Sequence, residues 1–151
     1  EFRQMAERGE FVEWAEVYGH LYGTSLGELN RLLRLENDVA LDVDSQGAKN
    51  IKTHFPGSVL IYILPPSLQE LERRLRERGT DEEAVIRSRM QEAVQEMENC
   101  FLYDYIVFND DLESSIEEVR SIIVSERCRT SRRAGAVRNR FPIREDVSAD
   151  D

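Results

Sequence analysis

The sequence predicts an α/β fold in which helices cover both faces of a parallel sheet. Two short runs, 59–64 and 105–108, are almost continuously apolar, as strands buried on both faces are. Helical patterns of apolar residues separate these runs, and strands that alternate with helices pair in parallel. A third segment, 11–24, has the aromatic and β-branched content of a hairpin and is expected to form a separate small lobe.

Residues 1–35 are expected to form this lobe and the helix that follows it. Ser25 and Glu28 make a capping box, in which a hydroxyl and an acid three residues later close the first turn of a helix. The expected elements are a helix at 1–8 ended by Gly9, strands at 11–18 and from Leu21, a turn at 19–20, and a helix from Ser25 to about residue 35.

Residues 36–129 are expected to hold the α/β core, with a helical lid at about 70–98. The core begins with a strand at 39–44, a helix at 46–54 and the strand at 59–64. It continues with a helix capped by Ser67 and Glu70, a break at Gly79, a helix capped by Thr80 and Glu83, the strand at 105–108 and a last helix. The residues expected to face inward are Leu68, Leu71 and Leu75, then Ile86, Met90, Ala93 and Met97, and finally Leu112, Ile116, Val119 and Ile123. The periodicity ends near residue 129, so 130–151 is expected to be a flexible tail.

Composition and charge exclude several classes of protein. The 151 residues are 40% hydrophobic and 33% charged, as in a globular domain. The formal charge of −10 is the opposite of the basic face that a nucleic-acid-binding protein shows, so no nucleic acid polymer is expected as partner. No apolar run approaches the roughly 18 residues that span a bilayer, and no membrane partner is expected. Cys100 and Cys128 form no metal-ligand pattern, which favours a cytoplasmic chain with free thiols.

Two carboxylates, Asp42 and Asp44, stand at the end of the apolar segment 39–44. Because they are two residues apart, they point to the same side of a strand. Enzymes that transfer phosphate present an acid to Mg²⁺ in this way, directly or through water. A strand end with two solvated acids remains the alternative.

Arginines gather in and after the expected lid. Arg74 and Arg78 are four residues apart on one helix, and Arg89 lies in the next helix. Guanidinium groups can grip the oxygens over which charge spreads during phosphoryl transfer. The alternative is a solvated helix face, with acidic partners at Glu70, Glu72, Glu77 and Glu82.

Glu13 lies in a strand that is otherwise rich in apolar residues, and Tyr22 and Thr24 lie on the returning strand. A carboxylate accepts two hydrogen bonds side by side, and guanine offers two adjacent donors, its N1–H and its 2-amino group. A glutamate beside a hydroxyl can therefore read guanine, whereas adenine lacks that pair of donors. An acid on an edge strand that faces water remains the alternative.

Taken together, these segments resemble the guanylate kinase family. The five motifs are Phe11–Ala15 with Leu21–Ser25, Leu41–Ala48, Ile63–Ser67, Arg78–Thr80 with Arg89, and Val107–Asp111. They stand in the family's order and at its spacing over roughly residues 1–130. The resemblance rests on all five in register rather than on any one of them.

The resemblance implies a role for each candidate residue. The implied substrate-binding residues are Glu13 and Thr24 at the guanine base, Tyr22 at the GMP phosphate and Asp44 at the guanine side of the site. The implied catalytic residues are the lid arginines Arg74, Arg78 and Arg89, which would close over the ATP phosphates and the transferred group. Asn109 and Arg78 are implied in ATP binding, and Asp42 would contact through water the Mg²⁺ that accompanies ATP.

The implied fold is of the P-loop kinase type, and the implied reaction moves a phosphoryl group from ATP to GMP, giving ADP and GDP. The family's phosphate loop would precede Glu1, and no such pattern occurs in the sequence, so these residues are expected to be inactive alone. One alternative is a catalytically dead interaction domain of the same fold, which retention of Asp42, Asp44 and the arginines disfavours. Another is a kinase for AMP or dTMP, which Glu13 with Thr24 disfavours.

Overall fold

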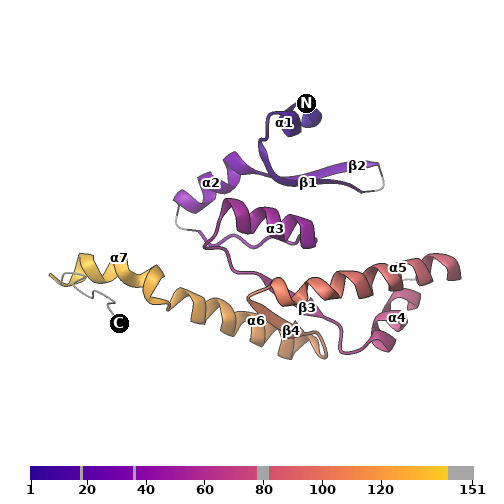
Figure 1. The fold of residues 1–151 in the computed structure, drawn as a ribbon. Helices are drawn as coiled ribbons and strands as arrows, with labels where there is room; N and C mark the ends of the chain where they lie inside the picture. Colours follow the sequence, from indigo (N-terminus) through magenta and orange to yellow (C-terminus); the bar gives the residue numbers. More distant parts are fainter. Residues whose placement is uncertain (18, 36, 78–81, 143–151) are drawn as a thin grey trace, which may run out of the picture.

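The computed structural model describes residues 1–17, 19–35, 37–77 and 82–142. In Figure 1 a β-hairpin lies above helix α3, and a pair of parallel strands lies below it. The strands are β1 (Phe11–Val17), β2 (His20–Ser25), β3 (Ile61–Leu64) and β4 (Tyr105–Phe108). The helices are α1 (Phe2–Glu7), α2 (Leu26–Arg34), α3 (Ser45–His54), α4 (Leu68–Glu77), α5 (Glu83–Met97), the 3-10 turn η1 (Glu98–Leu102), α6 (Leu112–Arg127) and α7 (Thr130–Arg140).

Composition predicted free thiols and no segment long and apolar enough to span a membrane. Both cysteines are free, as predicted, with Cys100 buried and Cys128 exposed. Within the described ranges, every helix is too short or too polar to cross a lipid bilayer.

The predicted hairpin of β1 and β2 is confirmed, but His20, which was expected in the turn, is the first residue of β2 and lies opposite Val17. The strands pair antiparallel, with Glu13 opposite Thr24. Gly19 in the turn has a φ of 78°, a left-handed conformation that glycine adopts at little cost. Helix α2 begins where predicted, because Ser25 Oγ accepts the backbone N–H of Glu28 at 3.3 Å.

A small apolar core joins the hairpin to α3. Val12 of β1, Leu29 of α2 and Ile51 of α3 are buried together, and Val39 and Val43 pack against them from the connecting segment. Burial of these side chains removes apolar surface from water, which fixes the hairpin against α3.

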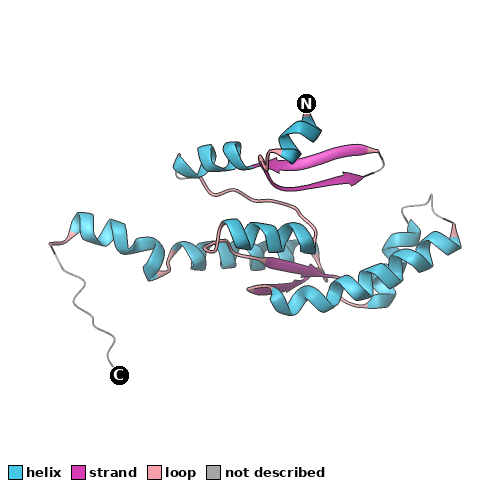
Figure 2. Cartoon of the chain, turned by 45° about the horizontal axis from the view of Figure 1, so that its top comes forward, coloured by secondary structure: helices cyan, strands magenta, loops and turns pink. Residues whose placement is uncertain are grey.

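The segment 39–44 is not the strand that its apolar residues predict. It runs as a loop into α3 (Figure 2), and none of the described strands pairs with it. A strand is stabilised by hydrogen bonds to a neighbouring strand, which apolar content alone does not supply. The valines of this segment are held by the apolar core instead.

Strands β3 and β4 form the predicted parallel pair, with Leu64 opposite Phe108. Asp104, just before β4, accepts the backbone N–H of Leu60 at 2.8 Å and the Lys52 ammonium at 3.0 Å, which ties the pair to α3. The described helices leave part of this strand pair exposed to solvent. The apolar strand residues that stay 40% or more exposed are Ile63, Ile106 and Phe108.

Helices α4 and α5 form the predicted helical hairpin after β3. Ser67 Oγ accepts the N–H of Glu70 at 3.1 Å, which confirms that cap. Helix α5 has Glu82 as its N-cap. The break at Gly79 and the cap at Thr80 lie outside the described residues.

The predicted inward faces hold for α5 and partly for α4. In α5, Ile86 is buried, and Met90, Ala93 and Met97 are half-buried. In α4, Leu71 and Leu75 are half-buried, but Leu68, the first residue of the helix, is 49% exposed.

Helix α6 buries a different face from the one predicted. The residues predicted inward that are exposed instead are Leu112, Ile116 and Ile123. Val119 is half-buried as predicted, and Ser115 and Glu126 are buried. Ser115 Oγ donates to the Phe108 carbonyl at 3.2 Å, and Glu126 accepts the Tyr105 hydroxyl at 2.6 Å. Ser115 Oγ also lies 2.7 Å from the Asp111 carbonyl, and the bond between Tyr105 and Glu126 is the shorter polar link from α6 to β4.

Part of the segment that was expected to be a flexible tail, Thr130–Arg140, forms the helix α7. Arg129 Nε and Arg132 Nη2 lie 2.8 and 3.6 Å from the carboxylate of Glu126. These ion pairs link the start of α7 to α6, and α7 has no continuous apolar stripe that would have predicted it.

Candidate functional site

A carboxylate and a hydroxyl meet across the hairpin. Thr24 Oγ1 of β2 donates to Glu13 Oε1 of β1 at 2.5 Å, and both residues are half-buried. Their register as opposite residues holds the two side chains on the same face. The predicted proximity of this acid and this hydroxyl is confirmed.

The amino end of α3 adjoins the same carboxylate. Asp44 is the N-cap of α3, and its Oδ1 accepts the N–H of Gly47 at 2.7 Å. Gly47 is buried, and a β carbon built on it would lie 3.3 Å from Asp44 Oδ1 and 3.4 Å from Glu13 Cγ. Glu13, Thr24 and Asp44 thus come together from three segments. The role of Gly47 was missed from sequence, because its need for close approach is visible only in the packing.

Gly47→Ala is expected to cost more stability than Gly27→Ala, by about 1–3 kcal/mol, because the new methyl overpacks the end of α3. Its β carbon would also lie 3.0 Å from Val43 Cβ. In the control, the β carbon meets only Ser25 Oγ at 3.8 Å, an ordinary contact, and alanine favours the helix. Chemical denaturation measures both variants, and equal stabilities would contradict this reading.

Tyr22 and Asp42 lie near this group and are more exposed. Tyr22 is two residues before Thr24, so it shares the same face of β2. It is 59% exposed, and its ring makes an edge contact with His20 at a centroid distance of 6.5 Å. Asp42 is exposed in the segment that leads into α3.

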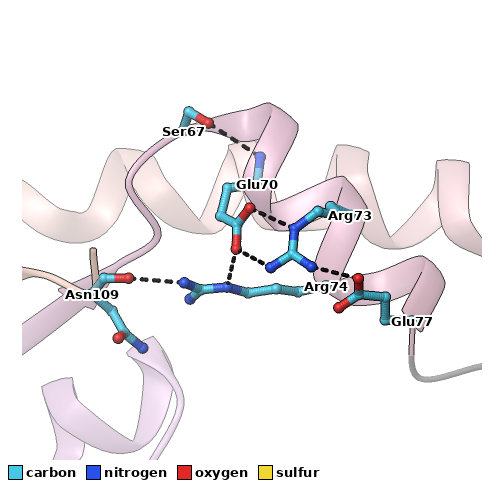
Figure 3. A network of polar contacts seen from close by, with 6 residues as sticks. All are labelled: Ser67, Glu70, Arg73, Arg74, Glu77 and Asn109. Carbon is cyan, nitrogen blue, oxygen red and sulfur yellow. Dashed lines mark hydrogen bonds and ion pairs between the residues drawn. The ribbon is translucent and has the colours of Figure 1, made fainter. Parts of the chain in front are cut away.

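A second group of candidate residues lies at the carboxyl ends of β3 and β4. Arg74 of α4 donates through Nη2 to the backbone carbonyl of Asn109 at 3.0 Å, and through Nε to Glu70 Oε1 at 2.8 Å. Figure 3 shows this network from close by. Arg74 and Asn109 also line a cavity of about 250 Å³, whose other walls are apolar residues from β3, α4 and the loop between them.

Glu70 also belongs to this group, although the sequence predicted only a helix cap with Ser67 and an acidic partner on a solvated face. Its carboxylate also accepts bonds from Arg73 Nε and Nη2, at 2.7 and 2.6 Å. The hydrogen bonds from Arg73 and then Arg74 lower the pKa of Glu70 from 4.5 to about 2. The group therefore remains a carboxylate at neutral pH. Its spacing of three and four residues from the two arginines was the available signal.

Of the other two arginines predicted for this region, the structure describes only Arg89. Arg89 is half-buried near the middle of α5. Arg78 lies outside the described residues, so the convergence of all three arginines stays a prediction.

Polar contacts join α3 to α5 and the turn that follows it, beside the first group. Ser45, the residue after Asp44, is buried and donates its hydroxyl to Glu96 of α5. One turn further along α3, Lys49 Nζ donates to Asn99 Oδ1 at 3.2 Å. The amino end of α3, which meets the β-hairpin, is therefore linked directly to α5 and η1.

The described part of the chain holds no group of three or more His, Cys, Asp or Glu side chains placed to bind a metal ion. Asp42 is an exposed single carboxylate. Mg²⁺ usually keeps several waters and is held by one or two carboxylates together with the phosphates of a substrate.

The chain is similar to known proteins in both sequence and structure. The family model described as Guanylate kinase matches residues 1–126. The guanylate kinase of Geobacter metallireducens is 46% identical over 143 residues, which cover 95% of this chain and 70% of that protein. That of Myxococcus xanthus is 48% identical over 132 residues, covering 87% and 63%. A crystal structure of guanylate kinase from Anaplasma phagocytophilum aligns with a TM-score of 0.74 at 30% identity, covering 95% of this chain and 71% of that one.

Proposed function

Because the chain belongs to the guanylate kinase family, the ATP:GMP phosphotransferases, we propose that it serves phosphoryl transfer from ATP to GMP, giving ADP and GDP. The family match confirms the resemblance drawn from the motifs and the α/β fold of P-loop kinase type. The chain spans 63% to 70% of the length of the two relatives named above, so the reaction is proposed for the full-length protein. The observation that carries the proposal is the Glu13–Thr24 pair beside Asp44.

This group has the chemistry that guanine requires. The Glu13 carboxylate can accept hydrogen bonds from N1–H and the 2-amino group of the base, and the Thr24 hydroxyl adjoins it. Adenine lacks this pair of donors and would leave the Glu13 carboxylate with the Thr24 hydroxyl but without partners on the base, at a cost of about 1–3 kcal/mol. Asp44 would bound the guanine side, and the exposed Tyr22 hydroxyl would donate to the GMP phosphate.

The second group would hold ATP. Asn109 would lie beside the adenine, and Arg74, Arg78 and Arg89 would stabilise the charge on the transferred group. Mg²⁺ bound with ATP would neutralise phosphate charge, and Asp42 would contact that ion through water. The expected cytoplasmic location is part of this proposal.

A phosphoryl transfer assay on the full-length protein tests the function. With ATP, Mg²⁺ and GMP, we expect ADP and GDP to form in equal amounts. AMP and dTMP in place of GMP should give little turnover, because neither offers the paired donors that Glu13 accepts. Turnover with AMP as fast as with GMP would contradict the proposal.

A further inference from the structure

Arg74 is held at two points of its guanidinium group. Nε donates to Glu70 and Nη2 donates to the Asn109 carbonyl, so the planar group is fixed between α4 and the end of β4 (Figure 3). Its side chain is 35% exposed, less than the 55% of neighbouring Arg73. Arginine has several rotatable bonds, and losing one of two contacts would let the group leave this position.

Glu70 is itself well positioned to fix a neighbour. Its backbone N–H is bonded to Ser67 Oγ at the start of α4, and its side chain is 23% exposed. Glu70 Oε1 accepts from both Arg74 and Arg73, and Oε2 accepts from Arg73. An acid in the first turn is also favoured by the helix dipole. The carboxylate is thus held by Arg73 at both of its oxygens while Oε1 also accepts from Arg74.

We propose that Glu70 is a positioning residue that holds the Arg74 guanidinium at the cavity formed by the ends of β3 and β4. This inference rests on the proposed function, in which Arg74 contacts the phosphates. Glu70 would not touch substrate, and it would act by keeping Arg74 in place before ATP arrives. Such preorganisation lowers the barrier because the group need not be ordered during the reaction.

If Glu70 served only to stabilise the fold, its removal would lower the melting temperature without a specific loss of kcat. Ion pairs on an accessible helix face contribute little to stability. Removing Glu70 should therefore scarcely change the melting temperature, yet it should slow the reaction if Arg74 depends on it. Glu77 supplies the matched control, because it pairs with Arg73 on the same helix and Arg74 has its bonds elsewhere.

Steady-state kinetics of full-length variants test this inference. We expect Glu70→Ala to lower kcat about 10-fold or more, the scale of a displaced catalytic group, with the KM for GMP within about twofold of the unsubstituted protein. Glu70→Gln, which keeps an acceptor oxygen, should recover part of the loss. Glu77→Ala should keep kcat within about twofold, because surface ion pairs matter little. In an Arg74→Ala background, Glu70→Ala should cost nothing further, since its target is gone.

The outcomes separate this inference from the function on which it rests. Loss of kcat by Glu77→Ala equal to that by Glu70→Ala would overturn the inference, as would a further loss in the Arg74→Ala background. A normal kcat for Glu70→Ala in a protein that phosphorylates GMP would overturn the inference and leave the function standing. Failure of the unsubstituted full-length protein to phosphorylate GMP would overturn both. If Glu70→Ala does not fold, the comparison of Glu70→Gln with Glu77→Gln gives the same test.

Discussion

Glu13→Gln in the full-length protein is expected to weaken GMP binding about 10- to 100-fold and to leave the KM for ATP within about twofold. The carboxylate can accept both adjacent donors of guanine, whereas an amide presents one acceptor and one donor. The amide N–H would then face a guanine N–H, and a buried donor would lose its partner. The Thr24 hydroxyl, which now bonds Glu13 Oε1, can still bond the amide oxygen. The hairpin should therefore fold normally.

Glu16→Gln is the matched control for this change. Glu16 lies on the same strand, opposite Leu21, and is exposed. Its substitution should leave the affinities for both nucleotides unchanged. Isothermal titration with GMP, together with steady-state kinetics for ATP, measures both variants. An equal loss for GMP and ATP in Glu13→Gln would count against guanine reading by this residue.

Arg89→Ala is expected to lower kcat by about 100-fold or more and to change the KM for GMP little. In the proposed site, Arg89 contacts the transferred group, whose charge is redistributed during the reaction. A contact made mainly in the transition state affects kcat rather than binding. Rapid-quench or coupled kinetics of the full-length variant measure the effect.

Arg87→Ala controls for the loss of one positive charge from α5. Arg87 is exposed two residues earlier on the same helix, where its charge acts on Glu83. It should keep a kcat near that of the unsubstituted protein. An Arg89→Ala variant with normal kcat would remove Arg89 from the catalytic residues.

Local signals in the sequence predicted the elements that depend on neighbours in the chain. The caps at Ser25 and Ser67 follow from a hydroxyl three residues before an acid, and both bond the expected backbone N–H. The strands at 61–64 and 105–108 follow from apolar runs with clear ends. The hairpin itself follows from two apolar runs around Gly19, but the pairing of Glu13 with Thr24 does not, because a turn at 19–20 would set Glu13 opposite Leu26.

Elements that depend on distant partners could not be predicted in this way. Counting apolar residues assigned α6 the wrong face. The buried Glu126 has a polar partner in the Tyr105 hydroxyl of β4, which the pattern of α6 alone does not reveal. The segment 39–44 has strand-like composition but no neighbouring described strand. Helix α7 contacts α6 through ion pairs to Glu126 that the pattern of its own residues does not reveal.

The candidate site, too, could be predicted only in part from the sequence. Residue types and motif order indicated which acids and arginines to inspect. They did not show that Asp44 also caps α3, or that Gly47 lies against Glu13. The contact of Arg74 with Asn109 joins residues 35 positions apart in sequence, and it becomes visible only when β4 lies beside β3.

Isothermal titration of the full-length protein with GMP and with AMP tests most directly whether a carboxylate on the hairpin selects the base. The two ligands share ribose and phosphate, so a difference in affinity reports on the base alone. We expect GMP to bind at least about 10-fold more tightly than AMP, because only guanine satisfies Glu13. Equal affinities would contradict the account.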